Sequence, residues 1–261
     1  LEAAGGYLSG MASYFQKLSP EILGSGYAGS FDRKLAGSIG PVCMRLRLEA
    51  TVRALADSLG EVLARRWSDR VWLINIGGGP SLDTLNALIL LRREKPDLLD
   101  RCRILIRVLD TDQNGPAFGR RCLAALASTR GPLEGLFVDF RQLEFDWSNP
   151  EPLREWLTEW RVAGDIAAVS SEGGLFEYGS DDDISGVLRI LRDHTPEDCT
   201  VVGSIFRDRE LNRMIKEMGK LTIRPRGIGP FSELIGSTGW RIAAEETDNP
   251  MCGVVTLRRR F

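Results

Sequence analysis

The sequence predicts an α/β protein with a doubly wound, mostly parallel sheet. From residue 71 onward, short runs rich in Val, Ile and Leu alternate with segments of helical apolar spacing, as expected for strands joined by crossover helices. The first run, VWLINI, passes through three glycines directly into a helical segment. The chain closes with two strand-like runs separated only by a turn at 248–250, so the last strand is expected to be antiparallel.

Residues 1–68 show no strand pattern. They contain one strong helix from about 41 to 66, whose apolar positions recur at helical spacing. We interpret 1–68 as a helical cap that packs over the ligand crevice or covers one sheet edge, and 69–261 as the ligand-binding domain.

The remaining elements follow in order. Parallel strands are predicted at 71–76, 104–109, 136–145, 166–169 and 200–206, and helices are predicted near 82–89, 118–126, 153–160, 181–191 and 211–218. Ser148 and Glu151 form a capping-box pattern before the third of these helices. The closing part is predicted to hold a short strand at 221–223, a short helix at 231–238 and strands at 240–245 and 253–257.

Composition excludes several classes of protein. The net charge of −2 comes from 34 basic and 36 acidic residues with no long run of either sign, so we expect neither nucleic acid nor a membrane as a partner. One histidine and five cysteines without a CxxC motif predict neither a metal site nor a disulfide framework. No apolar run approaches the roughly 18 residues of a membrane span, and no signal-peptide pattern is seen. We expect a cytoplasmic protein that acts on a small molecule.

The glycine turn is the clearest ligand signal. Gly77, Gly78 and Gly79 carry no Cβ, so the backbone can take positive φ and a ligand can approach peptide groups. Pro80 suits a first helical turn, and Ser81 can cap it. The N–H groups at the start of that helix would then face the ligand.

Polar residues follow the next strands, at the edge where such sheets bind ligands. Asp110 is the first choice to accept the two hydroxyls of a ribose and Asp112 the second, although both can instead cap the next turn. Asp146 can accept a hydrogen bond from an adenine amine while the Trp147 indole covers the purine. The alternative is an ordinary loop carboxylate beside a core tryptophan.

With these features the chain resembles the class I S-adenosylmethionine-dependent methyltransferases over residues 70–261. The resemblance rests on GGGPS, Asp110, the Asp146–Trp147 pair and the closing order of short helix, TGW, strand, PM turn and strand. It implies a seven-stranded Rossmann-like sheet and S-adenosylmethionine bound with its methionine end at the glycine turn. The cofactor-binding residues it implies are Gly77, Gly78, Gly79, Pro80, Ser81, Asp110, Thr111, Asp112, Asp146, Trp147, Ser170 and Ser171.

The sequence departs from that family at Asn75, where an acidic residue often stands two positions before the first glycine. The usual contact to the cofactor's amino group must therefore be weaker or come from elsewhere. On the helix at 41–66, Arg45 and Arg47 can either reach the cofactor carboxylate or be exposed to solvent.

Methyl transfer mainly requires that the nucleophile be held in line with the sulfonium, so a catalytic base is not essential. The candidates for one are Glu172, Glu177 and Tyr178 in SSEGGLFEYGS, which can equally be loop or substrate-binding residues.

Two alternatives stay open. One is an NAD(P)-dependent oxidoreductase, although Leu82 stands where a GxGxxG motif needs its third glycine. The other is a non-catalytic cofactor-binding partner subunit. Transfer of the cofactor's aminocarboxypropyl group is a related possibility. The substrate, the acceptor atom and the oligomeric state are not fixed by the sequence.

Overall fold

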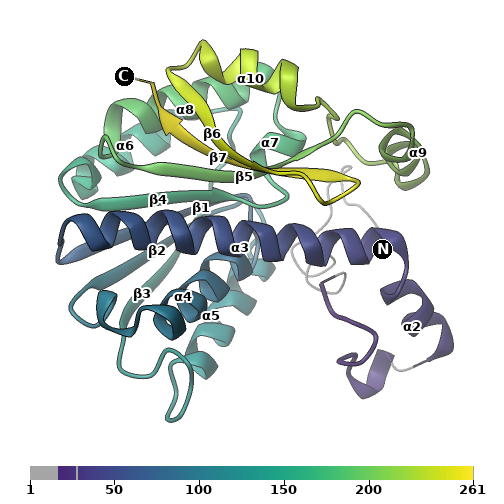
Figure 1. The fold of residues 1–261 in the computed structure, drawn as a ribbon, viewed down its shortest axis with the longest axis horizontal. Coiled ribbons are helices and arrows are strands. Elements are labelled where there is room, and N and C mark those ends of the chain that lie inside the picture. Colours follow the sequence, from purple (N-terminus) through teal and green to yellow (C-terminus); the bar gives the residue numbers. More distant parts are fainter. Residues whose placement is uncertain (1–16, 28, 261) are drawn as a thin grey trace.

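The computed structural model describes residues 17–27 and 29–260 and forms a seven-stranded sheet (Figure 1). The spatial order is β3-β2-β1-β4-β5-β7-β6. Strands β1 to β5 pair in parallel, and β7 runs antiparallel between β5 and β6. The strands are β1 (Arg70–Ile76), β2 (Arg103–Leu109), β3 (Phe137–Leu143), β4 (Ile166–Ser171), β5 (Thr200–Phe206), β6 (Trp240–Glu246) and β7 (Cys252–Arg259). The predicted fold class, including the antiparallel last strand, is confirmed.

Helices connect the strands in the predicted order. The α-helices are α2 (Ser30–Ala36), α3 (Ile39–Arg65), α4 (Leu82–Glu94), α5 (Asn114–Leu126), α6 (Glu151–Trp160), α7 (Leu175–Tyr178), α8 (Asp181–His194), α9 (Glu210–Gly219) and α10 (Ile228–Gly236). Short 3-10 turns lie at η1 (Ser25–Tyr27), η2 (Pro96–Leu98) and η3 (Val162–Gly164). Helix α8 begins with a reciprocal capping box between Ser180 and Asp183, which satisfies two N–H groups at its start.

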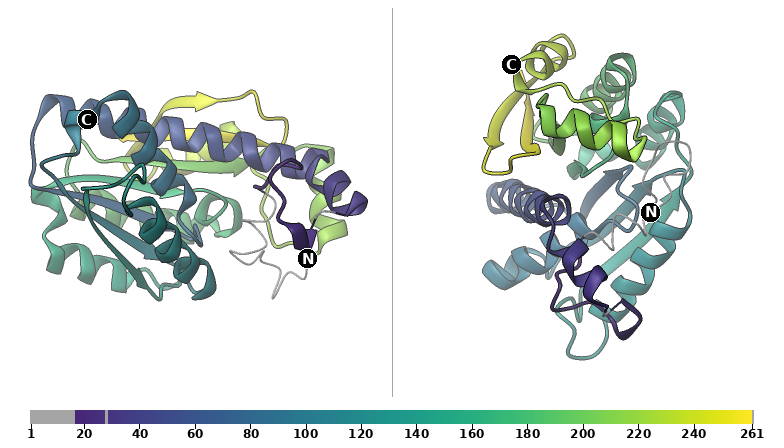
Figure 2. Two further views of the ribbon diagram at one scale, coloured as in Figure 1. Left: turned by 90° about the horizontal axis from the view of Figure 1, so that it is seen from below. Right: turned by 90° about the vertical axis from the view of Figure 1, so that its right-hand side faces the viewer.

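The sheet has a helical layer on each face (Figure 2). Helices α3, α4 and α5 share one buried core with the sheet, and α6, α8 and α10 share the other. Helix α3 buries Leu55, Leu59 and Val62 in the first of these cores and contacts β4, β5 and β7. The apolar stripe of α3 thus packs on the sheet face. The division into a cap (1–68) and a binding domain (69–261) stays a prediction.

Two local predictions are wrong. Residues 221–223 form no strand. The chain just beyond them is hydrogen-bonded to α7 and β5 instead. The N–H of Arg224 donates to the carbonyl of Glu177, and the N–H of Arg226 donates to the carbonyl of Phe206. The capping box predicted from Ser148 does not form, since α6 has Pro150 at its N-cap position and no side-chain cap. The N–H of Ser148 donates instead to the carboxylate of Asp146.

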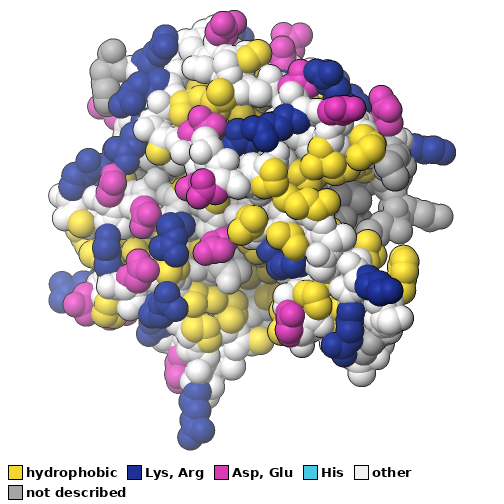
Figure 3. Space-filling model, turned by 45° about the vertical axis from the view of Figure 1, so that its right-hand side comes forward, with side chains coloured by type: hydrophobic (Ala, Val, Ile, Leu, Met, Phe, Trp, Pro, Cys, Tyr) yellow, Lys and Arg dark blue, Asp and Glu magenta, His cyan; other side chains and the backbone are white. Residues whose placement is uncertain are grey.

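The carboxyl end of the sheet carries α9, which follows β5, together with α2 and the start of α3, which projects past the strands (Figure 1). Hydrophobic side chains gather on the face of the molecule shown in Figure 3. Large apolar residues exposed in these segments and the loop before them are Ile22, Phe31, Ile39, Leu46 and Met214. Among the described residues, no helix is both long enough and apolar enough to cross a membrane.

Candidate functional site

The glycine turn joins β1 to α4 and is packed by the protein's own groups. Gly77 and Gly79 have positive φ values of 66° and 54°. A Cβ on Gly77 would lie 2.7 Å from the ring of Trp147, and one on Gly78 would lie 2.0 Å from Oδ1 of Asn75. Close packing within the protein therefore already explains why these positions need glycine. The glycines alone therefore do not indicate a ligand, and the polar groups around the turn have to be considered.

The start of α4 differs from the prediction. Pro80 precedes the helix, which begins at Leu82. Ser81 occupies the N-cap position, but its side chain makes no capping hydrogen bond. Its φ of 55° and ψ of 40° are left-handed, whereas a capping side chain reaches the first helical N–H groups from extended backbone. The prediction that Ser81 caps the helix is wrong.

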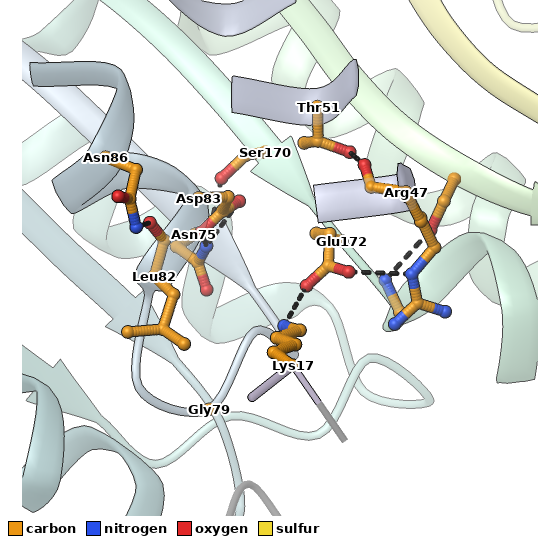
Figure 4. A network of polar contacts seen from close by, with 12 residues as sticks. Lys17, Arg47, Thr51, Asn75, Gly79, Leu82, Asp83, Asn86, Ser170 and Glu172 are labelled. Atoms are coloured by element: carbon orange, nitrogen blue, oxygen red, sulfur yellow. Dashed lines mark hydrogen bonds and ion pairs between the residues drawn. The ribbon is translucent and has the colours of Figure 1, made fainter. Parts of the chain in front are cut away.

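Asn75 connects three elements at the turn. It pairs in register with Ser170 of the neighbouring strand β4, and its Nδ2 donates to the Ser170 hydroxyl at 2.9 Å (Figure 4). The same nitrogen contacts Oδ1 and Oδ2 of Asp83, in the first turn of α4, at 2.8 and 3.0 Å. Asn75 and Asp83 are both buried. Burial, with the nearby charge of Glu172 adding to it, raises the pKa of Asp83.

Three buried polar atoms beside this turn have no hydrogen-bond partner among the described residues. They are Oδ1 of Asn75, Oγ of Ser81 and Oγ1 of Thr84. An unsatisfied buried polar group costs about 1–3 kcal/mol, so several in one ten-residue segment call for an explanation. A polar ligand that supplies both donors and acceptors would satisfy them.

Asp110 ties the glycine turn to the end of β2. Its Oδ2 accepts the N–H of Gly79 and its Oδ1 accepts the N–H of Asp112, both at 2.8 Å. Burial raises the pKa of Asp110. Each carboxylate oxygen keeps a second lone pair, so the predicted contact to a ribose is compatible with this geometry and stays a prediction.

Asp112 begins α5. Its carboxylate accepts the N–H groups of Asn114 and Gly115 at 3.0 and 3.1 Å, which is the capping role that the sequence left open. Thr111, between the two aspartates, is exposed. Its predicted cofactor contact, like that of Asp112, stays a prediction.

Asp146 and Trp147 differ in their exposure to solvent. Asp146 is exposed and accepts the N–H of Ser148 at 2.9 Å. Trp147 is half-buried, packs against the core and reaches Gly77. The indole, for which the adenine contact was predicted, therefore lies directly beside the glycine turn. That contact remains a prediction.

Ser171 ties β4 to the end of β1. Its hydroxyl donates to the carbonyl of Ile76 and accepts the N–H of Leu175, both at 2.8 Å. Ser170 and Ser171 are both buried. The structure thus gives both serines a positioning role at the carboxyl end of the sheet, and their contact with a cofactor stays a prediction.

A buried ion cluster follows β4. Glu172 accepts hydrogen bonds from Nζ of Lys17 and, at 2.6 Å, from Nε of Arg47 (Figure 4). Nη1 of Arg47 contacts both oxygens of Glu177 at 3.0 Å, and the Ser204 hydroxyl donates to Glu177 at 2.6 Å. Arg47 lies on α3, far from the glutamates in sequence, so periodicity could not place it here. It is buried, so the expectation of a solvent-exposed Arg47 is wrong.

The pKa values of the two glutamates are shifted in opposite directions. Burial acts to raise the pKa of Glu172, but the charges and hydrogen bonds of Arg47 and Lys17 outweigh it and lower that pKa to about 2. For Glu177 burial prevails and raises the pKa, although Arg47 acts against it. Glu172 in this state is a weak base with its oxygens engaged.

The remaining base candidate, Tyr178, is half-buried and packs against a small apolar cluster that includes Met44 and Phe206. A role as base for Glu172, Glu177 or Tyr178 stays a prediction. Over the part of the chain that the structure describes, no group of three or more His, Cys, Asp or Glu side chains could hold a metal ion.

No protein-family model matches the sequence, and no curated protein matches it. Solved structures do match its fold. A DUF574 family protein from Streptomyces avermitilis MA-4680 is 16% identical, with a TM-score of 0.62 over 99% of this chain and 98% of that one. The N,N-8-amino-8-demethyl-D-riboflavin dimethyltransferase RosA from Streptomyces davawensis is 14% identical, with a TM-score of 0.50 over 90% of this chain and 61% of RosA.

A structure described as a pericyclic reaction enzyme is 16% identical, with a TM-score of 0.50 over 77% of this chain, and the chain spans 47% of that protein's length. With the strand order and the inserted antiparallel β7, these matches define the class: the chain has the Rossmann-like fold of the class I S-adenosylmethionine-dependent methyltransferases.

Proposed function

We propose that this protein binds S-adenosylmethionine and transfers its methyl group to a small molecule. The observation that carries the proposal is the set of three buried, unsatisfied polar atoms on Asn75, Ser81 and Thr84, beside the turn that in this fold receives the cofactor's methionine end. Sequence identities of 14–16% to the compared structures support the fold alone. The support for the proposed activity therefore comes from the residues of the site.

The residues present fit the methionine end of the cofactor. An ammonium group offers N–H donors, which Oδ1 of Asn75 can accept, and the Asp83 carboxylate next to that amide supplies the opposite charge. The hydroxyls of Ser81 and Thr84 can donate to the cofactor's carboxylate, which the start of α4 also favours through its dipole. Asp83 thus replaces the acid that family members often carry at position 75.

Asp110, Asp146 and Trp147 fit the adenosine end. Asp110 has spare lone pairs for the ribose hydroxyls, and the Trp147 ring beside Gly77 provides a flat apolar surface for the purine. Asp146 is exposed and can accept a hydrogen bond from the adenine amine.

When bound, the cofactor supplies a methyl group activated by its sulfonium. The protein then has to hold the acceptor in line with that group and exclude water. Because Glu172 is fixed by Arg47 and Lys17, we infer that Glu172 does not act as a strong general base in the reaction. The acceptor that fits is a small molecule with an available lone pair. The exposed apolar residues at the carboxyl end of the sheet support one with an apolar body.

An NAD(P)-dependent oxidoreductase fits less well. A dinucleotide-binding sheet has the order 3-2-1-4-5-6, whereas here an antiparallel strand lies between β5 and β6. Position 82 is Leu, where the dinucleotide motif needs glycine. We further propose a cytoplasmic location, because the five cysteines are all free and four of them are buried.

Product analysis separates the remaining possibilities. The protein is incubated with S-adenosylmethionine and a panel of small amines, thiols and phenols, and the nucleoside products are measured by mass spectrometry. We expect S-adenosylhomocysteine, the product of methyl transfer. Methylthioadenosine would instead indicate aminocarboxypropyl transfer. Cofactor binding without either product across the panel would contradict the enzyme proposal and favour the partner-subunit alternative.

A further inference from the structure

A second polar site lies at the opposite end of the sheet. A groove of about 520 Å³ opens over the first residues of β1, β2 and β3, between these strands and the end of α6. With a rise of about 3.3 Å per strand residue, Trp72 near the middle of the groove is roughly 16 Å from Gly77. The groove lies on the sheet face covered by α6, and none of the predicted cofactor residues lines it.

The groove is strongly basic. Asp139 and Glu159 are the acidic residues among those that line it, and Asp165 lies beside it. Strand alternation places the arginines of β1, β2 and β3 on one sheet face, next to one another in neighbouring strands, and the end of α6 adds one more. The five arginines that line it are Arg70, Arg103, Arg107, Arg141 and Arg161.

These arginines outnumber their acidic partners. Arg107 and Arg141 share the single carboxylate of Asp139, at 2.9 and 3.1 Å. Among the described residues, no carboxylate lies within ion-pair distance of Arg103 or Arg161; Arg103 instead stacks on the ring of Phe137, 4.9 Å from its centroid. Arg103 and Arg161 thus have no ion-pair partner, and two further arginines share one carboxylate. The groove therefore has a positive electrostatic potential.

Arg107 is a rigid anchor within the groove. It is only 5% exposed, and its guanidinium lies 5.2 Å from the ring centroid of Trp72 and 5.6 Å from that of Trp160. The two indoles stack on each other with centroids 5.3 Å apart. Hydrogen bonds from Arg107 to Asp139 and to the carbonyl of Ile106 fix the group further. A buried guanidinium held by aromatic rings is already oriented before a ligand arrives.

We propose that this groove binds a small ligand carrying two or more phosphate groups. Guanidinium forks match phosphate oxygens in pairs, and the groove's volume lies within the range of small-ligand pockets. The site is separate from the cofactor site, so the inference does not depend on the proposed methyltransferase activity.

The test uses pyrophosphate and ATP as probes in calorimetric titrations of the wild-type chain at low salt. The variant is Arg103→Gln with Arg161→Gln, because Gln tolerates the left-handed backbone of Arg161 no worse than Arg does. The matched control is Arg53→Gln with Arg93→Gln, two exposed helical arginines outside the groove, which changes the net charge equally. We expect the groove variant to weaken pyrophosphate binding at least tenfold and the control to leave it within twofold.

Equal affinities for pyrophosphate and ATP would assign recognition to the phosphates alone, and tighter ATP binding would add a contact to the base. Both results support the proposal. It is overturned if neither probe binds the folded wild-type chain, or if both double variants lose affinity equally. A single-stranded oligonucleotide that binds through Arg103 and Arg161 far more tightly than either probe would also overturn it, in favour of a nucleic-acid surface.

Discussion

The side-chain amide of Asn75 donates to the carboxylate of Asp83, with Nδ2 2.8 Å from Oδ1 and 3.0 Å from Oδ2. The contact joins the end of β1 to the first turn of α4 across the glycine turn. It leaves the amide oxygen of Asn75 directed at Gly78. One buried amide and one buried carboxylate therefore stand together where the cofactor's ammonium group is proposed to bind.

An exchange of the two residues tests this pair. We expect Asp83→Asn to weaken binding of S-adenosylhomocysteine about 10- to 100-fold, because a charge-assisted hydrogen bond contributes about 1.5–3 kcal/mol. Asn75→Asp should also weaken binding, since it buries two carboxylates side by side. The double variant Asn75→Asp/Asp83→Asn keeps one of each group and should recover most of the affinity. If the double variant binds no better than either single one, while its circular dichroism is unchanged, the pair does not act as proposed.

Cofactor affinity should depend on pH through Asp83. The ionised carboxylate attracts the ammonium group, and burial raises the pKa of Asp83 above its ordinary value of 3.8. Protonation on acidification therefore removes the attraction, and it begins at a higher pH than for an exposed aspartate. We expect the dissociation constant of S-adenosylhomocysteine to rise as the pH falls from neutral in the wild-type chain, and to change less in Asp83→Asn. Parallel pH profiles for the two proteins would rule out this role.

Glu172→Gln should destabilise the fold by about 3 kcal/mol, because it removes the carboxylate that pairs with buried Lys17 and one of the two carboxylates that pair with buried Arg47. The pKa of Glu172 falls from 4.5 to about 2 on folding. A lowered carboxyl pKa contributes stability above the unfolded value and loses it as the pH falls through the folded value. In urea unfolding, the difference in the free energy of unfolding between the wild type and the variant should therefore become smaller below pH 4.5.

The control for that variant is Glu61→Gln, which removes an exposed ion pair with Arg258 and should cost less than about 1 kcal/mol. If Glu172→Gln is no more costly than this control, the buried cluster does not stabilise the fold.

Gly78→Ala should disturb the site through Asn75. The added methyl group would lie 2.0 Å from Oδ1 of the Asn75 amide, which is buried and held by hydrogen bonds to Asp83 and Ser170. We expect a loss of about 1–3 kcal/mol in stability, as for other overpacked positions, together with a marked loss of cofactor affinity. Gly164→Ala is the matched control, because nothing lies within 4 Å of its added Cβ. Unchanged melting temperature and affinity in Gly78→Ala would contradict the packing described for the turn.

The fold was largely predictable because strand and helix periods are local properties of the chain. The runs at 71–76 and 104–109 became β1 and β2 with boundaries shifted by one residue. The strand predicted at 221–223 does not form, and the residues just beyond it, Arg224 and Arg226, are hydrogen-bonded to partners far along the chain. The places of the glycine turn and Asp110 at strand ends predicted that the two lie close together, and the N–H of Gly79 does donate to Asp110.

Asp83 and Arg47 could not be assigned from the sequence. In the sequence, Asp83 looks like an ordinary acidic residue in the first turn of a helix. Only the conformation of the glycine turn brings it into contact with Asn75, eight residues earlier. Arg47 meets Glu172 only when α3 is laid across the sheet, a pairing 125 residues apart. Such contacts depend on tertiary packing and leave no periodic signal.

Isothermal titration calorimetry of the wild-type chain with S-adenosylhomocysteine decides whether the protein binds the cofactor, because it measures binding without the need for a methyl acceptor. We expect saturable binding of one molecule per chain, with a dissociation constant roughly in the micromolar range. The absence of binding heat from folded protein at millimolar ligand, at more than one temperature, would contradict this expectation.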